Sequence, residues 1–308
     1  MKQPDIVALG EPLVEMVRTS GEPGGPATYS SDVGGDALNA LVAAARQGAS
    51  TGLISSVGND PFGSQILAFC RNEAISTEAV MIADRHPTGL CFIHPDPKDR
   101  HFFYARQGSA ASHFGPENLP EQTIAKAKVL HVTGVSQAIS QCMREAVRRA
   151  AEVAKSHHTL VSYDLNIRPK LWSLEDAKAC VDGFLPLADI VLPSDDEAQR
   201  LLGTCDPEAI LTFFGRFNPL AVILKRGAEG VIVRTSDEDI TVRAPSVDAI
   251  DSSGAGDSFA GACLAYFLET GSITEAARLA VHVAAATVTG HGATGAIPTR
   301  EMIEPLQR

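Results

Sequence analysis

The sequence has no excess of basic residues and no long uninterrupted apolar run. Its 308 residues carry 26 lysines and arginines against 37 aspartates and glutamates, a formal net charge of −11. Nucleic acids and anionic membranes favour basic surfaces, so this balance argues against both as partners. It does not exclude a small anionic substrate, which a few local arginines can bind. An apolar stretch at residues 276–288 is interrupted by Arg278 and His282, so we expect no membrane-spanning helix.

Cysteine is sparse and shows no ligand or disulfide pattern. The six cysteines include no Cys-x-x-Cys pair, and no histidine stands at metal-ligand spacing from them. We interpret them as buried or idle thiols in a reducing compartment. The first ten residues are too short and too interrupted for a signal peptide. The sequence therefore predicts a soluble cytoplasmic protein.

Two common nucleotide-binding loops are also missing. The chain has no Gly-x-x-x-x-Gly-Lys-Ser/Thr loop, which excludes a P-loop enzyme. The Gly254-Ala-Gly256 segment has Phe259 where a dinucleotide fingerprint requires its third glycine, and no strand directly precedes it. A nicotinamide-dependent enzyme is therefore not favoured.

Short β-rich runs alternate with helical patterns along most of the chain. The expected strands are residues 5–10, 51–58, 128–134, 159–165, 188–193, 220–225 and 230–235. The expected helices are residues 36–48, 61–74, 137–157, 173–186, 195–202 and 207–217. Several strands are continuously apolar, as in sheets covered by helices on both faces. The order predicts an α/β fold with a three-layer, mainly parallel sheet. No linker or repeat divides it, so we expect a single domain over residues 1–308.

Two segments break this alternation. Residues 11–33 and 88–106 lack helical periodicity, and the second alternates around a turn at residues 95–99 like a β-hairpin. Either they form extra strands of a small sheet or they are ordinary surface excursions. A small sheet would expose strand edges and an apolar face, which proteins usually cover. We therefore expect residues 88–106 to join the small sheet of a second copy in a homodimer.

The most informative segment is Asp-Ser-Ser-Gly-Ala-Gly-Asp-Ser-Phe at residues 251–259. An apolar helical pattern starts at about Gly256 and ends at Gly271. The N–H groups at a helix start bind anions, and glycines allow a phosphate to approach the main chain closely. Asp257 would repel a phosphate there unless it acts as a general base for an attacking hydroxyl. The alternative is that Asp257 is an ordinary helix-capping residue.

Four motifs in sequence order resemble those of the ribokinase-like (pfkB) carbohydrate kinases. Residues 251–259 resemble the C-terminal signature of that family, and residues 34–39 resemble its glycine pair and sugar-binding motif. Residues 58–63 and 225–230 resemble a characteristic turn and the nucleotide-site loop. The resemblance implies a ribokinase-like fold in which residues 11–33 and 88–106 form a β-sheet lid over the sugar.

The resemblance also implies ATP with Mg²⁺ and a nucleotide side of the site. The expected ATP-binding residues are Asn166, Ser194, Lys225, Gly227, Gly230, Gly254, Ala255, Gly256 and His282. Glu197 would help to organise Mg²⁺ indirectly, and Ser194 departs from the asparagine usual in that motif. For His282, a surface position is the alternative. The resemblance leaves open a potassium ion bound by carbonyls near Asp251 and the glycine turn at residues 289–293.

The substrate side points to an acid sugar. Arg106 and Arg168 could each bind a carboxylate through two hydrogen bonds, although each could instead pair with an acidic neighbour. With Tyr104, they resemble the 2-keto-3-deoxygluconate kinase branch, where a tyrosine usually stands at the position of Cys91. The expected substrate-binding residues are Gly34, Gly35, Asp36, Asn39, Cys91, Tyr104, Arg106, Asn166, Arg168 and Asp257.

The resemblance thus implies transfer of phosphate from ATP to the terminal primary hydroxyl of 2-dehydro-3-deoxy-gluconate. Asp257 would be the base, and Gly254, Ala255 and Gly256 would stabilise the transferred phosphoryl group. Two alternatives stay open. One is a kinase for a neutral ketose or nucleoside, and the other is a non-catalytic sugar-acid sensor with the same fold.

Overall fold

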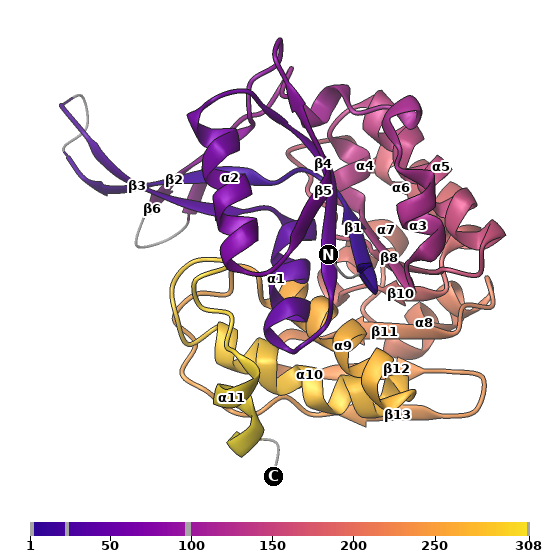
Figure 1. Ribbon diagram of the computed structural model, residues 1–308. Coiled ribbons are helices and arrows are strands. Elements are labelled where there is room, and N and C mark those ends of the chain that lie inside the picture. The colour runs from indigo at the N-terminus through magenta and orange to yellow at the C-terminus, as the bar shows by residue number, and fades with distance from the viewer. Residues whose placement is uncertain (1–2, 22–24, 96–99, 307–308) are drawn as a thin grey trace.

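The computed structural model describes residues 3–21, 25–95 and 100–306. It contains a nine-stranded sheet between two layers of helices and a separate four-stranded sheet (Figure 1). The large sheet has the strand order β13-β12-β11-β10-β9-β8-β1-β4-β5. Its strands from β5 to β11 run parallel, and β12 and β13 are antiparallel additions at one edge. The expected α/β fold with a mainly parallel sheet is confirmed.

The strands of the large sheet agree with the sequence pattern, with two additions. They are β1 (Ile6–Leu9), β4 (Thr51–Gly58), β5 (Ser76–Ala83), β8 (Val129–Thr133), β9 (Leu160–Asp164), β10 (Ile190–Leu192), β11 (Ala221–Lys225), β12 (Val231–Arg234) and β13 (Asp239–Val242). The sequence analysis did not identify β5 and β13. Both are edge strands with half-exposed, mixed side chains, so neither carries the continuous apolar signal of a central strand.

Helices cover both faces of this sheet because its central strands are buried on both sides. Ile6 and Ala8 of β1 belong to one hydrophobic core, and Val7 and Leu9 belong to the other. The first core is covered by α1 (Asp36–Arg46), α2 (Pro61–Asn72), α9 (Ala255–Thr270), α10 (Ile273–Thr287) and α11 (Arg300–Ile303). The second is covered by α3 (Glu121–Lys126), α4 (Gly134–Ala138), α5 (Gln141–Ser156), α6 (Leu174–Phe184), α7 (Asp195–Leu202) and α8 (Pro207–Gly215).

One expected helix is wrong in its extent. Residues 137–157 are not one helix, because α4 ends at Ala138 and α5 begins at Gln141. Ser140 causes the break, since its hydroxyl accepts a hydrogen bond from the amide of Met143 at 3.0 Å and caps α5. Short 3₁₀ turns connect other elements, at η1 (Ala111–His113), η2 (Pro116–Asn118), η3 (Leu185–Leu187), η4 (Gly227–Glu229) and η5 (Glu304–Leu306).

The two irregular segments form the small sheet. Its strands are β2 (Leu13–Ser20), β3 (Thr28–Gly34), β6 (Leu90–Pro95) and β7 (Arg100–Ala105), in the order β3-β2-β6-β7. The β6–β7 hairpin is confirmed, and residues 96–99 at its turn lie outside the described residues. One face carries a small core of Leu13, Cys91 and Ile93. Figure 1 shows β2, β3 and β6 projecting beyond the helices of the main body.

The turn at residues 58–63 anchors this small sheet to the large one. Asp60 accepts hydrogen bonds at 2.8 Å from the amides of Gly63 and Thr88 and from the Thr88 hydroxyl. The Thr88 hydroxyl also accepts a bond from the Gly58 amide at 2.9 Å. Although burial acts to raise it, these hydrogen bonds hold the pKa of Asp60 below its usual value. The carboxylate therefore ties the end of β4 to the residues that lead into β6.

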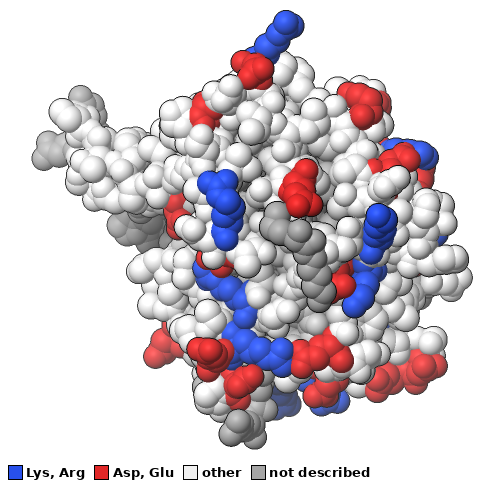
Figure 2. Space-filling model, in the orientation of Figure 1, with Lys and Arg blue, Asp and Glu red and all other residues white. Residues whose placement is uncertain are grey.

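The surface carries charged side chains of both signs. Figure 2 shows basic and acidic side chains interspersed on one face of the molecule, with no continuous basic area there. Within the described residues, no helix is long and apolar enough to cross a bilayer.

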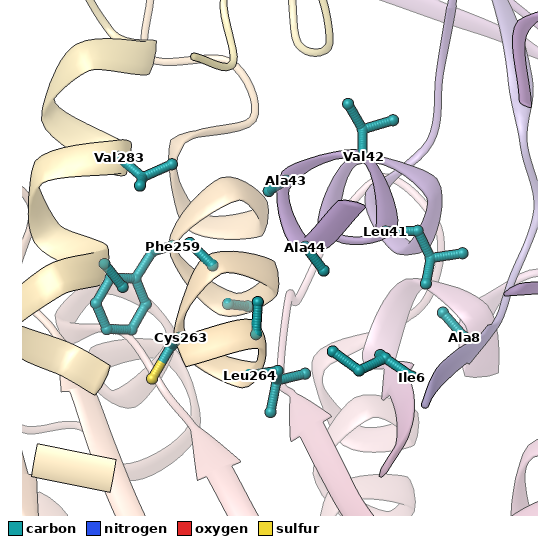
Figure 3. Packing of buried hydrophobic residues seen from close by; sticks show 14 of the residues in the cluster. Ile6, Ala8, Leu41, Val42, Ala43, Ala44, Phe259, Cys263, Leu264 and Val283 are labelled. Atoms are coloured by element: carbon teal, nitrogen blue, oxygen red, sulfur yellow. The ribbon is translucent and has the colours of Figure 1, made fainter. Parts of the chain in front are cut away.

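Helices α1 and α9 pack in close contact. Figure 3 shows Ala43 and Ala44 of α1 on the side nearer to Phe259 and Leu264 of α9. Small residues permit this approach, and Gly261 is the tightest point. A Cβ atom added to Gly261 would lie 1.9 Å from the carbonyl oxygen of Ala40.

We expect Gly261→Ala to lower the free energy of unfolding by about 1–3 kcal/mol or more, since α1 and α9 would have to separate. Gly215→Ala is the matched control, because Gly215 is also helical and nothing lies within 4 Å of its added Cβ. It should be neutral, or stabilising by up to about 1 kcal/mol. Urea unfolding of both variants measures the difference. Equal stability of the two variants would show that the contact between α1 and α9 can accommodate a methyl group at position 261.

Candidate active site

A cavity of about 1040 Å³ lies between the two sheets. It opens where the parallel strands of the large sheet end, the usual ligand position in an open α/β sheet. The small sheet supplies part of its lining through Glu15, Asp32, Cys91 and Tyr104, and Arg106, which directly follows β7, adds to it. The large sheet and its helices supply Asp36, Asn39, Asn166, Arg168, Ser194, Glu197, Lys225, Gly254, Gly256 and Asp257. The topology therefore brings both expected halves of the site together.

Asp257 is buried in the first turn of α9. Its two carboxylate oxygens accept hydrogen bonds from the side-chain amides of Asn39 at 2.8 Å and Asn166 at 3.1 Å. Burial, with the nearby charge of Asp36 as a second cause, raises the pKa of Asp257 to about 7, against the opposing hydrogen bond from Asn39. A carboxyl group with a pKa near neutrality is suited to accept a proton.

The start of α9 has the geometry of an anion site. Gly254 caps the helix in the left-handed conformation (φ 73°), and its added Cβ would lie 2.7 Å from the carbonyl oxygen of Ala293. A side chain is therefore excluded there, and the first amides of the helix have no intrahelical acceptors. Asp251 fixes the approach to the helix, because its carboxylate accepts from the amides of Ser253 at 2.9 Å and Gly292 at 3.0 Å.

A buried ion pair lies beside this helix start. The Lys225 ammonium donates to both carboxylate oxygens of Asp164, at 2.7 and 2.6 Å. Although burial acts to lower it, Asp164 and Glu197 raise the pKa of Lys225, so the side chain stays charged. A Cβ added to Gly256 would lie 3.4 Å from the lysine nitrogen, which places that cation next to the glycine turn.

Glu197 joins two loops at the sheet edge. Its carboxylate accepts from the amide of Ile167 at 2.9 Å and from the amide of Ser194 at 2.8 Å. Burial raises the pKa of Glu197. Ser194, in place of the asparagine usual in the motif that this segment resembles, caps α7 and completes a capping box with this glutamate. Capping and a place in the cavity lining therefore coexist at Ser194.

The two arginines expected to bind a carboxylate differ in their surroundings. Arg106 is buried and paired with Glu11, with its Nε and one terminal nitrogen 2.6 and 2.5 Å from the same carboxylate oxygen. The Ser109 hydroxyl donates to the other oxygen, and burial raises the pKa of Glu11. For Arg106, pairing with an acidic neighbour is thus what the structure shows.

Arg168 has no such partner. Its side chain is exposed, lines the cavity and makes no ion pair with any residue that the structure describes. Lys170, two residues further on, shares these properties. Their cationic groups face the same cavity as Tyr104 and Cys91. Burial and the Glu15 charge raise the pKa of Cys91 to about 12, so its thiol is not a nucleophile at neutral pH.

Two polar features near the sugar-binding motif were not predicted from the sequence. Thr133 donates its hydroxyl hydrogen to the Asp36 carboxylate and fixes that side chain. The side-chain oxygen of Asn39 is buried and has no hydrogen-bond partner within the described structure. A buried acceptor of this kind is costly unless a ligand satisfies it, so it marks a position for a donor such as a sugar hydroxyl.

Four expected site residues do not line the cavity. Gly34 faces the Glu15 carboxylate, and Ala255 is the first residue of α9. Gly230 closes the β11–β12 turn with φ 94°, where a Cβ would meet the Val242 carbonyl at 2.0 Å. His282 is half-buried on α10, away from the lining.

Sequence reasoning missed Glu15, Asp32 and Lys170, which all line the cavity. Lys170 is only two residues from Arg168, so its charge was an available signal. Glu15 and Asp32 stand in an irregular segment whose strand register the sequence does not specify.

Comparison with known proteins places this geometry in a family. Residues 3–300 match the family described as pfkB family carbohydrate kinase. The chain is 33% identical over 307 residues to a 2-dehydro-3-deoxygluconokinase of Thermoproteus tenax, covering 98% of this chain and 93% of that protein. It is 31% identical over 318 residues to the probable fructokinase-4 of Arabidopsis thaliana, covering 98% and 96%.

A solved structure shows the same fold. The fructokinase of Xylella fastidiosa with bound ATP superposes with a TM-score of 0.89 at 25% identity, covering 98% of each chain. A family match over nearly the whole chain, relatives named as sugar kinases and a shared fold agree with one another. This chain therefore belongs to the pfkB family of carbohydrate kinases and is a sugar kinase.

Proposed function

We propose that the protein phosphorylates a sugar acid with ATP, and that the substrate is 2-dehydro-3-deoxy-D-gluconate, converted to its 6-phosphate. One observation carries the proposal. A buried carboxyl group with a pKa of about 7 lies in the first turn of α9, at an anion-binding helix start, and lines the same cavity as the unpaired cation Arg168. The first feature suits proton transfer, the second suits phosphate, and the third suits the carboxylate of an acid sugar.

In the proposed reaction, the primary hydroxyl of the sugar lies beside Asp257. Its oxygen forms a bond to the γ-phosphorus as the bond from that phosphorus to the ADP oxygen breaks, and Asp257 takes the hydroxyl proton. The amides at the start of α9 stabilise the charge on the transferred phosphoryl oxygens, and Lys225 adds a positive charge beside them. Asn39 and Asn166 hold the carboxylate in position by donating to both of its oxygens.

Magnesium would neutralise phosphate charge when it binds with ATP. Among the described residues, no group of three metal-ligating side chains stands ready, and both Glu197 oxygens already accept backbone hydrogen bonds. The residues present fit a cation held mainly by phosphate oxygens and water, as Mg²⁺ usually is. Glu197 then acts indirectly, by fixing the loops at the phosphate. A potassium ion near Asp251 and the turn at 289–293 stays part of the proposal.

The acid substrate is supported by the cations and by one relative. Arg168 and Lys170 both face the cavity without a counter-ion among the residues described, which favours an anionic group on the sugar. The Thermoproteus tenax relative is named for the same sugar acid. The fructokinase relatives support the alternative of a neutral ketose, since their identity is nearly as high.

In this proposal the chain works as one kinase domain over residues 1–308, with the small sheet as a lid. We also propose that two copies associate through their lids. The outer face of the small sheet carries Tyr29, Phe92 and Phe103, whose rings stack edge-on or tilted at 5.8 and 6.2 Å. Phe103 is 65% exposed, and a second copy of this face would cover it.

Asp257→Asn should lower kcat at least about 100-fold, because it removes the proton acceptor while keeping the size of the side chain. The parent enzyme should lose kcat/KM as the pH falls through 7, by about tenfold per unit once Asp257 is mostly protonated. A coupled ADP assay from pH 5.5 to 8.5 measures both. Turnover of the variant within a few-fold of the parent would contradict the role. Absence of turnover by the parent on every sugar and sugar acid tested would favour the non-catalytic sensor.

Arg168→Ala should reduce kcat/KM for the acid sugar about ten- to a hundredfold more than for its neutral analogue, the effect of one lost charge-assisted hydrogen bond. Arg168→Lys should restore little, because an ammonium group cannot make two parallel bonds. Arg106→Ala is the comparison, since it leaves Glu11 buried without its partner. It should reduce both activities alike and lower the melting temperature. Equal losses on both sugars in Arg168→Ala would favour the neutral ketose.

Phe103→Asp should shift the protein from dimer to monomer, because a charge on the covered face would lose its water. Met302→Asp is the matched control, since Met302 is 64% exposed on α11, away from the lid. Light scattering at micromolar concentration measures both variants. A parent protein that is monomeric and fully active would exclude the need for lid pairing.

A further inference from the structure

One loop near the C-terminus touches both halves of the cavity. Thr294 is 1% exposed, and its hydroxyl donates a hydrogen bond at 2.8 Å to the carbonyl oxygen of Val33. Val33 is the next-to-last residue of β3, so it belongs to the small sheet. The contact joins residues 261 positions apart in the sequence.

The same loop also holds the start of α9. The Gly292 amide donates to the Asp251 carboxylate at 3.0 Å, just before the helix. The backbone of Ala293 lies against Gly254 so closely that a Cβ on the glycine would meet its carbonyl oxygen at 2.7 Å. A shift of this loop would therefore disturb the glycine turn, where we place the phosphate.

The loop cannot adapt independently, because its other side is fixed to α1. Arg46 donates to the Thr294 carbonyl oxygen at 2.8 Å, and the Gln47 side chain donates to the Pro298 carbonyl oxygen at 2.9 Å. Arg46 is itself held by two bonds to Glu73, at 2.9 and 2.7 Å. These hydrogen bonds hold the loop in place against α1. Among the described residues, Thr294 makes the one side-chain hydrogen bond from this loop to the small sheet.

We propose that Thr294 is a positioning residue that couples strand β3 of the small sheet to the phosphate-binding start of α9. The physical reason is the cost of a buried hydroxyl and carbonyl left without partners if β3 and the loop move separately. Binding of a nucleotide at α9 then favours one position of β3, and a sugar held by the small sheet favours the same position of the helix start. The assignment of the two sides rests on the proposed function.

The test measures amide hydrogen exchange of residues 28–34 with and without a non-hydrolysable ATP analogue and Mg²⁺. In the parent, the analogue should slow exchange in β3. Thr294→Val removes the hydroxyl at nearly constant volume and should reduce that protection about three- to tenfold, the effect of one net hydrogen bond. Thr294→Ser retains the hydroxyl and should restore it.

Thr287→Val is the matched control. Thr287 is equally buried, and its hydroxyl donates to the Val283 carbonyl oxygen at the same 2.8 Å, but inside α10. It should lose stability like Thr294→Val and keep the nucleotide-dependent protection. In kinetics, Thr294→Val should raise the KM for the sugar at saturating ATP with little change in kcat, which a loss of stability alone does not do.

Unchanged protection in Thr294→Val, or no nucleotide-dependent protection of β3 in the parent, would overturn the proposal. Equal loss of protection in Thr287→Val and Thr294→Val would overturn it as well, because it would show a general loosening. Turnover of the parent on the acid sugar is measured separately. A parent that binds the analogue and protects β3 but phosphorylates no acid sugar would refute the proposed substrate and leave the role of Thr294 intact.

Discussion

The close contact of α1 with α9 is the constraint on which the rest of the site depends. Gly261 lies one helical turn after Asp257, and Ala40, which it meets, directly follows Asn39. The absence of a side chain at Gly261 therefore allows the Asn39 amide to come within 2.8 Å of the Asp257 carboxylate. Asp257 is buried at this contact, and burial is the main cause of its raised pKa. Helix packing thus sets the chemistry of the proposed base.

The distribution of buried charge separates structure from function. Two buried ion pairs are complete, Lys225 with Asp164 and Arg106 with Glu11. Removing one partner of either pair would leave the other charge buried without a counter-ion. The first pair joins the ends of β11 and β9, and the second joins the residue after β7 to the segment between β1 and β2. Asp257 is buried with amide partners and has no ion-pair partner among the residues that the structure describes, and Arg168 is exposed to the cavity. We expect groups of this kind, which have no ion-pair partner in the described structure, to be the ones that contact the sugar.

The fold was predictable because its signals are local. Continuous apolar strands, glycine ends and capping residues predicted the parallel sheet and its helices, and the pairing of β6 with β7 followed from the alternation around its turn. The edge strands β5 and β13 were not predictable. Their mixed, half-exposed side chains show neither a continuous apolar run nor a regular alternation of apolar and polar residues. The break before α5 could have been found, because Ser140 is an ordinary capping residue in an apparently continuous helix.

The site was predictable to the extent that its residues stand in short motifs. Asp257, Asn39 and Arg168 were identified in this way, and all line the cavity. Their partners were not, because partners are set by tertiary contacts. Nothing local indicates that Glu11 neutralises Arg106, 95 positions away. Charge alone therefore suggested two equivalent arginines where the structure holds one paired and one unpaired.

The small sheet has a consequence for biosynthesis. Its centre is a parallel pair, β2 with β6, whose strands are more than 70 positions apart in the sequence, so the first hairpin cannot complete its sheet alone. During translation, Leu13 cannot be buried against Cys91 and Ile93 until β6 has been synthesised and has left the ribosome. Meanwhile the nascent chain presents an unpaired strand edge to solvent. Folding of the enzyme is therefore most exposed to aggregation and chaperone binding early in synthesis, at its N-terminus.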